Sequence, residues 1–579
     1  MSSSLFRRKE IASILSQSGN ESDHGSGLKR ILTARDLTFF GIAAIIGAGS
    51  FSSLGGAVFS GGPGVVVLFL ICSIACGFTA YCYAEFASRV PVAGSAYTYA
   101  YASFGELMAW IIGWALLMEY SIGNIYVSFS WSDYFTTLLE KFNLGLPAYL
   151  TCSYKEASVA IHDNANVPDL VEAWNKAPIL LGQKIIFDLP AFIINILITY
   201  LVYRGVKESR NFSNAMVMLK LVVIAIVILV GGILIFSRDL WANLTPANVR
   251  GEHSFMPNGF GGVMKAVSGV FFAYIGFDAV SVLAEESKNP QRDLPKGMIW
   301  SLIICTIIYI ILALVLTGSV VYSKFEGIGD PLAFIFEKDN LDIHWMVILI
   351  AFCAVIAMTS VLLVFQLGQP RIWMSMSRDG LLPPAFQKIH AKYKTPSFAT
   401  IVTGIVVGLP ILFTDKNFVL DFTSIGTLFA FVLVCGGVLL LPPRPREQGK
   451  FHLPNINSQW LFPMITVLAC VVISTQFSGY FKELFNGDFT DKKENLDHFF
   501  FPNGANKFST ILFWIMMVAM SVLSFLKKLS LIPVLGMMSC LYLLTGMTAS
   551  NWAWFFGWFA VGLLIYFFYG YKHSRLNHA

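Results

Sequence analysis

Residues 45–51, of sequence IIGAGSF, interrupt what would otherwise be an ordinary apolar helix over about residues 37–59. Glycine weakens a helix, and Gly47 and Gly49 do so at a depth where the backbone finds no water. Such a break persists in a bilayer only where protein or a water-filled cavity surrounds it. It exposes backbone N–H groups at a half-helix N-terminus, which suit a carboxylate because the helix dipole also attracts it.

A second interrupted stretch, residues 271–278 of sequence FFAYIGFD, lies in the sixth apolar segment. A break here frees the carbonyl groups of Phe272, Ala273, Tyr274 and Ile275 at a half-helix C-terminus, and these suit an ammonium. Two breaks at matching positions of two halves indicate the central site of a transporter. Together they describe a receptor for a zwitterion such as an α-amino acid. The alternative is a pair of packing kinks, a common use of glycine in membranes.

Lys220 lies inside the fifth apolar segment, where a charged side chain costs at least ~2.5 kcal/mol unless it is paired or reaches the surface. Burial disfavours its charged form, so we predict that it gains and loses a proton during transport. The alternative is a fixed structural cation that bonds the unwound carbonyls of the first segment. Thr359 and Ser360, midway along the eighth segment, either bond this ammonium or satisfy their own helix backbone.

Two carboxylates are predicted inside the membrane, Glu119 in the third segment and Asp278 at the end of the second break. A carboxylate there is protonated, lines the pocket or meets a substrate amine. For Asp278, a structural hydrogen bond to the opened backbone is the alternative. The sequence has no Walker loop, dinucleotide-binding glycine pattern, metal-spaced His/Cys set or catalytic triad, so we expect no catalysis, cofactor or metal.

Membrane helices must position these residues, because the composition excludes a soluble protein. Of the 579 residues, 56% are hydrophobic and 13% are charged, whereas soluble domains carry about 25% charged residues. Apolar runs long enough to cross a bilayer recur along the chain. We predict fourteen spans, at about 37–59, 64–87, 98–128, 185–203, 213–236, 259–287, 297–321, 344–376, 396–413, 418–442, 459–477, 509–526, 530–547 and 552–570.

Lys and Arg concentrate in the loops that this count places on one side, and the positive-inside rule makes that side cytoplasmic. Both termini are then cytoplasmic, in an integral, multi-pass protein of the cell membrane. Two long outer loops, 131–183 and 478–507, have no readable function. The net charge of +5 is no sign of nucleic-acid binding, and the expected partners are an amino acid and membrane lipids. The sequence leaves the oligomeric state open.

Six motifs are specific in combination. They are GAGSF at 47–51, GSAYTY at 94–99, EY at 119–120, FFAYIGFD at 271–278, NPQRDLP at 289–295 and SRDGLLP at 377–383. Together they resemble the amino acid–polyamine–organocation superfamily, and within it the cationic amino acid transporter family and its bacterial members.

The breaks and the resemblance imply an all-α polytopic membrane protein of 14 transmembrane helices. Its core would be a 5+5 inverted repeat of the leucine-transporter type, with helices 1 and 6 broken. We divide the chain into a cytoplasmic segment, two repeats and a set of accessory helices, at 1–35, 36–236, 258–442 and 457–571.

The resemblance also implies a role for each site residue. The substrate carboxylate would meet the first break, at Ile45, Gly47, Ala48 and Gly49. The substrate amine would meet carbonyls of the second break, at Phe272, Ala273 and Ile275. Glu119 would border the pocket and connect towards Asp278. Lys220 would replace a sodium ion and couple transport to protons, beside Thr359 and Ser360.

We therefore predict a secondary active amino acid permease, with proton-coupled symport of α-amino acids by alternating access. Residues 364–370, of sequence VFQLGQP, depart from the family pattern, because relatives often carry smaller or Met-like residues there. Phe365 or Gln366 would restrict side-chain volume, which favours neutral or broad α-amino acids. The alternatives are an uncoupled exchanger or facilitator for cationic amino acids, and a receptor that binds an amino acid without transporting it.

Overall fold

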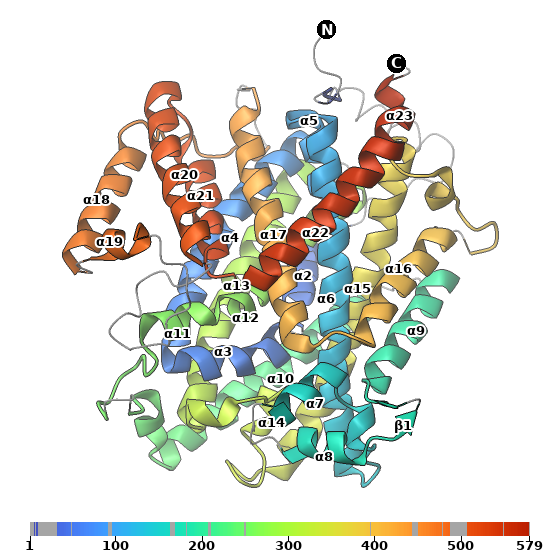
Figure 1. The fold of residues 1–579 in the computed structure, drawn as a ribbon, viewed down its shortest axis with the longest axis vertical. Helices are drawn as coiled ribbons and strands as arrows, with labels where there is room; N and C mark the ends of the chain where they lie inside the picture. The colour runs from blue at the N-terminus through green and yellow to red at the C-terminus, as the bar shows by residue number, and fades with distance from the viewer. Residues whose placement is uncertain are drawn as a thin grey trace.

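The structure is a computed structural model, and its helices pack side by side into one bundle (Figure 1). It describes residues 5, 7–9, 32–47, 49–90, 95–162, 168–180, 182–205, 210–247, 251–393, 395–442, 450–476, 479–486, 506–547 and 549–577. Within these residues, the strands are β1 (Ile179–Leu180) and β2 (Gln183–Lys184), an antiparallel pair in the first long loop. The predicted all-α fold is therefore modified only by this small hairpin.

The first predicted break is present. The helix α2 (Ala34–Ile45) begins with a capping box, in which Thr33 and Asp36 bond each other's backbone, and its C-cap is Ile46. The chain resumes as a single π-helical turn, η2 (Gly49–Ser53), and continues as α3 (Leu54–Gly61). π-Helical turns are rare in proteins, and those that occur frequently lie at functional sites.

The second predicted break is also present. The helix α12 (Val267–Phe272) ends in a turn at residues 273–276, within the predicted stretch. Before it, α11 (Gly259–Lys265) is bent by 47° from the segment Val267–Ser281. Gly276 ends that turn with a φ of +115°, a conformation that side chains rarely adopt. The chain then continues as a 3-10 helix, η6 (Phe277–Glu286).

Each of the other predicted spans also contains a helix. Their bounds are α4 (Val65–Arg89), α5 (Ser95–Ser103), α6 (Glu106–Lys141), α9 (Leu189–Arg204), α10 (Arg210–Ser237), α13 (Pro290–Ser319), α15 (His344–Arg378), α16 (Ser397–Ile411), α17 (Lys416–Leu440), α18 (Leu461–Gln476), α20 (Asn506–Lys527), α21 (Leu531–Leu544) and α22 (Ala549–Ile565). Among the described residues, 7 helices are long and apolar enough to cross a membrane, or 8 if the bent pair is one span. Fourteen crossings and the inverted repeat stay predictions.

The first outer loop is shorter than predicted, because α6 continues to Lys141 instead of ending near residue 128. Polar side chains of this extension find partners in neighbouring segments: Ser132 bonds Asp188 and Thr137 bonds Asp330. The rest of the loop holds α7 (Tyr154–His162), α8 (Pro168–Lys176) and the hairpin. The second loop begins with α19 (Tyr480–Leu484), and most of it lies outside the described residues.

Two groups of helices flank the breaks. In one group α13 packs against both α2 and α4, and in the other α6 packs against both α15 and α17. The helix α10 contacts members of both groups, and α12 lies against η2 and α17. In Figure 1, α9 and α16 lie at one edge of the molecule, and α18 and α20 lie at the opposite edge. The breaks therefore lie inside the bundle and not on its surface.

Gly49 offers a test of the contact between the breaks. A Cβ atom at this position would lie 2.5 Å from the Cα of Ala273, so one of the two segments must move. We expect Gly49→Ala to lower the unfolding temperature, because overpacking costs about 1–3 kcal/mol. Thermal unfolding of the purified protein measures this.

Gly56→Ala is the matched control, because a Cβ atom there meets nothing within 4 Å. It should leave the unfolding temperature unchanged or raise it slightly. Equal unfolding temperatures for Gly49→Ala and Gly56→Ala would contradict the packing of η2 on the second break.

Candidate functional site

The two breaks are in direct contact. Besides the approach of Gly49 to Ala273, the hydroxyl of Ser53 donates to the carbonyl oxygens of Gly49, at 2.7 Å, and of Gly269, at 2.8 Å. Ser53 is 3% exposed and Ala273 is fully buried. The hydroxyl group thus joins the backbones of the two interrupted helices at a point that water does not reach.

At the first break, the carbonyl oxygens of Ile45 and Gly47 already have protein partners. The carbonyl of Ile45 accepts from the hydroxyl of Tyr309 at 2.9 Å. The carbonyl of Gly47 accepts from the N–H groups of Ser50 and Phe51, both at 3.1 Å. The groups left to donate to the substrate carboxylate are therefore the N–H groups of residues 47–49. Ala48 lies outside the described residues. Gly47 itself faces Val361 of α15.

At the second break, Phe272, Ala273 and Ile275 are all buried. The carbonyl of Phe272 accepts from the N–H of Ile275 at 3.2 Å, and a carbonyl oxygen has a second lone pair for another donor. The ring of Phe272 packs edge-on against Tyr126 of α6, with ring centroids 4.5 Å apart. The predicted amine acceptors thus lie beside an aromatic wall.

The two intramembrane carboxylates come together behind the breaks. Glu119 is 2% exposed and Asp278 is 3% exposed, and they lie close enough to interact electrostatically. Among the described residues, Glu119 Oε2 and the hydroxyl of Tyr83 are buried without a hydrogen-bond partner. Buried polar atoms normally have partners, so each of these two atoms could accept a further hydrogen-bond partner.

Tyr83 is a site residue that the sequence analysis did not identify. It lies on α4, and its ring packs edge-on against Phe277, directly before Asp278. A tyrosine on a long apolar helix gives no signal by itself, because only the fold shows which face it occupies. The same is true of Tyr126.

Lys220 meets the end of the first half-helix. It is 2% exposed, and its Nζ atom donates to the carbonyl oxygens of Ala43 and Ile46, both at 3.2 Å. The last carbonyls of a helix lack intrahelical partners and carry partial negative charge. This geometry is the one expected of a fixed structural cation. The same contact would also weaken if Lys220 lost a proton.

Thr359 and Ser360 bond their own helix. Their hydroxyl groups donate to the carbonyls of Val355 and Ala357, each at 2.7 Å. Thr359 also accepts from the indole N–H of Trp131 on α6 at 3.0 Å. Both residues line a cavity of about 240 Å³ between α2, α10 and α15, which also borders Ala43. This cavity lies beside a carbonyl that Lys220 bonds.

The side of the first break that the predicted topology places outside is covered. The hydroxyl of Ser52 donates to the carbonyl of Gly329 at 2.7 Å, and Lys416 donates to that carbonyl at 3.4 Å. Lys416, at the start of α17, also forms an ion pair with Asp133 of α6. The loop before α14 (Pro331–Phe334) is thereby joined to η2 and to the group of α6, α15 and α17.

The two residues predicted to limit solute volume point to different places. The ring of Phe365 packs edge-on against Tyr120 at 5.6 Å and lies over Gly123. Gln366 instead accepts from Asn124 and donates to Thr199 at 2.8 Å, within the group of α6, α9 and α15. Phe365 therefore remains the candidate for restricting the solute, because Gly123 lies one turn from Tyr126.

Two touching helix breaks inside a largely apolar helical bundle are consistent with a polytopic membrane protein whose interrupted helices meet in its interior. A family profile described as "Amino acid permease" matches residues 32–482, and one described as "C-terminus of AA_permease" matches residues 529–574. The chain belongs to the amino acid permease family, as the motifs predicted.

Three relatives illustrate the range of this family. The chain is 39% identical to the branched-chain amino acid permease BcaP of Bacillus subtilis, over 82% of this chain and 92% of the relative. It is 34% identical to a methylthioribose transporter of Bacillus subtilis, over 99% and 100%. It is 30% identical to cationic amino acid transporter 3, mitochondrial, of Arabidopsis thaliana, over 100% and 96%.

The stability of the contacts around Gly329 should depend on pH through Asp330. Asp330 lies next to Gly329 and accepts from Thr137 at 2.8 Å. Burial raises the pKa of Asp330 to about 7, with Glu337 and Asp133 adding to the increase, while Thr137 and Lys416 act in the opposite direction. An unfolded Asp ionises near pH 4, so the folded state holds this proton more tightly. The stability that it contributes is present below about pH 4 and is lost as the pH rises through about 7.

We therefore expect the unfolding temperature to fall between pH 5 and pH 8, and to fall less in Asp330→Asn. Thermal unfolding at each pH measures both slopes. Asp339→Asn, an exposed acid in the same loop, should keep the slope of the unchanged protein. Equal slopes for Asp330→Asn and Asp339→Asn would refute the role of Asp330.

Proposed function

We propose that the protein is a secondary active transporter of α-amino acids, driven by protons and working by alternating access. The observation that carries the proposal is the buried contact between the two interrupted helices, Gly49 against Ala273. Irregular backbone at membrane depth is tolerated where it is buried in protein or lines a cavity, and paired breaks form the solute site in transporters. Membership of the amino acid permease family supports the solute class.

The substrate would lie between the breaks. Its carboxylate would accept from the N–H groups of residues 47–49, at the positive end of the second half-helix. Its ammonium would donate to the carbonyls of Phe272, Ala273 and Ile275. Glu119 Oε2, which is buried without a described partner, would then complete the cationic side. These contacts recognise the part that all α-amino acids share.

Movement would involve the helix group of α2, α4 and α13 turning against the group of α6, α15 and α17. Lys220 lies on α10 and bonds two carbonyls of the α2 segment. A protonated amine offers three donors and a full charge to these carbonyls, and a neutral amine holds them more weakly. Loss of the proton would release α2 to move, which links the proton to the conformational change.

Lys220 variants distinguish the coupling role from the structural role. In proteoliposomes with an inwardly directed proton gradient, we expect Lys220→Ala to abolish concentrative uptake. We expect Lys220→Arg to fold and to exchange substrate, but not to concentrate it, because arginine stays charged. Uptake of labelled amino acid under pH and sodium gradients measures this.

Lys265→Ala is the control, because Lys265 is an exposed lysine at the C-terminal end of α11. It should retain uptake driven by the pH gradient. Concentrative uptake by Lys220→Arg would support a fixed cation and refute proton shuttling, and uptake that ignores the pH gradient in the unchanged protein would refute proton coupling altogether.

The side-chain pocket favours an apolar solute. Phe365 lies over Gly123, and Phe272 lies over Tyr126 one turn further along α6. The rings of Phe365 and Phe272 offer apolar surface to a branched or aromatic side chain, and neither supplies a carboxylate to pair with a charged one. The branched-chain amino acid permease among the relatives agrees with this expectation.

A second candidate solute is methylthioribose. The transporter named for it aligns with 99% of this chain, including the C-terminal helices, whereas the branched-chain permease covers 82%. A thiosugar lacks both charges of an amino acid, so it would leave the N–H groups of the first break without a carboxylate.

A competition panel against one labelled substrate separates these solutes. We expect leucine, isoleucine and valine to compete at concentrations at least about tenfold lower than lysine, arginine or methylthioribose. A charged side chain in an apolar pocket, or a thiosugar without a carboxylate and an amine, would leave buried polar groups unpaired. Stronger competition by methylthioribose would reject the amino acid assignment. Stronger competition by lysine or arginine would reject the apolar side-chain pocket.

A further inference from the structure

The helices α9 and α16 lie at the edge of the molecule, away from the helix breaks (Figure 1). Side chains of both helices line a groove. Its volume is about 460 Å³, within the range of small-molecule sites. Its walls are half-exposed apolar side chains of both helices, including Ile196, Ile401, Ile405 and Leu409. Because both helices are apolar and lie in predicted spans, the groove opens towards lipid and not towards water.

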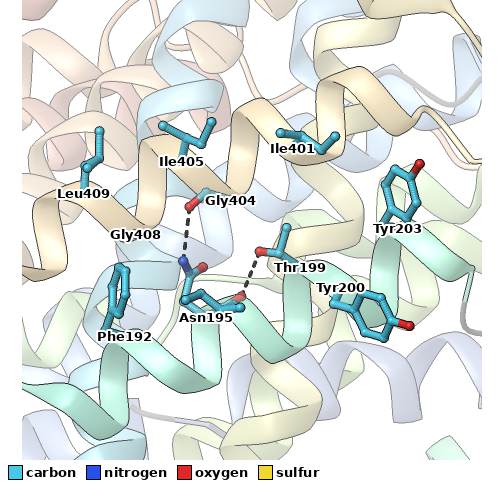
Figure 2. Close-up of a pocket in the computed structure, with 11 residues that line it drawn as sticks. Phe192, Asn195, Thr199, Tyr200, Tyr203, Ile401, Gly404, Ile405, Gly408 and Leu409 are labelled. Carbon is cyan, nitrogen blue, oxygen red and sulfur yellow. Dashed lines mark hydrogen bonds between the residues drawn. The ribbon is translucent and has the colours of Figure 1, made fainter.

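The floor of the groove is built by close helix packing (Figure 2). A Cβ atom at Gly404 would lie 2.5 Å from Thr199, and one at Gly408 would lie 2.7 Å from Asn195. The amide of Asn195 donates to the carbonyl of Gly404 at 3.1 Å. The small residues thus hold α16 against α9, and the larger side chains on either side leave a channel above the contact.

One end of the groove is aromatic and basic. Tyr200 and Tyr203 line this end (Figure 2). Arg204 bonds the hydroxyl of Tyr200 at 3.2 Å and lies 5.8 Å from the centre of the Tyr393 ring, and Lys392 lies 5.5 Å from the same ring centre. Both cations are exposed, and neither forms a salt bridge with any of the described residues. Two cations of like charge around one ring attract an anion.

The predicted topology places this end at the cytoplasmic surface, where anionic lipid headgroups lie. We propose that the groove binds an anionic phospholipid of the cytoplasmic leaflet. An acyl chain would lie between α9 and α16, and the phosphate would lie between Arg204 and Lys392. Basic pockets between membrane helices on this side are a known means of binding such headgroups.

The site connects to the transport core by hydrogen bonds. Thr199, at the floor, accepts from Gln366 of α15, and Gln366 accepts in turn from Asn124 of α6. The same helix α6 carries Glu119 and Tyr126. A lipid that fixes α9 against α16 therefore stabilises the group of helices against which α2 would move.

Lipid binding to the purified full-length protein tests the proposal. Native mass spectrometry measures retained lipid, and thermal unfolding measures stabilisation, with phosphatidylglycerol, phosphatidylcholine or soluble glycerol phosphate added. We expect phosphatidylglycerol to be retained and to raise the unfolding temperature, and phosphatidylcholine and glycerol phosphate to do neither.

Two variants test the two halves of the site. The double variant Arg204→Glu, Lys392→Glu should weaken phosphatidylglycerol binding by about tenfold or more. Ile405→Trp, which fills the groove from a half-exposed position, should lose retention while keeping both cations. The control Lys527→Glu, Lys572→Glu reverses two other exposed cations and should bind as the unchanged protein does.

Equal binding of phosphatidylglycerol by the charge-reversed and control variants would overturn the proposal. So would equal retention of phosphatidylcholine, which would leave only unspecific lipid contact. Stabilisation by glycerol phosphate alone would assign the cations to a soluble anion. Full retention by Ile405→Trp would exclude the groove as the place of the acyl chain.

Discussion

A backbone group that a helix break frees within a bilayer must find another partner, because no water is available there. In this protein, side chains from other helices supply those partners. Lys220 bonds the carbonyls of Ala43 and Ile46, and Tyr309 bonds the carbonyl of Ile45. Ser53 bonds the carbonyls of Gly49 and Gly269. The break is therefore stable only while α10, α13 and the second break stay in place.

This dependence distinguishes α2 from a continuous helix. A continuous helix satisfies its own backbone, whereas the carbonyls of Ala43 and Ile46 at the end of α2 accept from Lys220. At the outer end the connections are of the same kind: Ser52 and Lys416 share the carbonyl of Gly329, and Asp133 holds Lys416. The two helix groups are also joined by the packing of α4 on α17, where Tyr83 lies edge-on to Phe431.

The sequence predicted the elements well, because glycine pairs and apolar runs are local signals. Residues 45–51 and 271–278 are interrupted as expected, and Lys220 lies inside its helix. Partners could not be predicted, because they come from residues far apart in the chain. Neither Tyr309 nor Tyr83 differs locally from the other tyrosines of apolar helices. The length of α6 was wrong for a related reason: its polar extension is stabilised by Asp188 and Asp330 in other segments.

In the described core, the contacts at the two breaks are made by backbone groups more than by side chains that select a solute. That distinction agrees with the relatives, whose names cover branched-chain amino acids, cationic amino acids and methylthioribose at 30–39% identity. In this chain, we expect side chains such as Phe365, which faces Tyr120 and Gly123, to contribute to the selection of the solute.

The central claim is that the two breaks together hold the solute. An experimental structure determined with leucine bound tests this most directly. The account predicts density for the amino acid between residues 47–49 and residues 272–275, with its carboxylate on the first break and its amine on the second. Leucine bound elsewhere, with no density for a solute at residues 47–49 and 272–275, would contradict it.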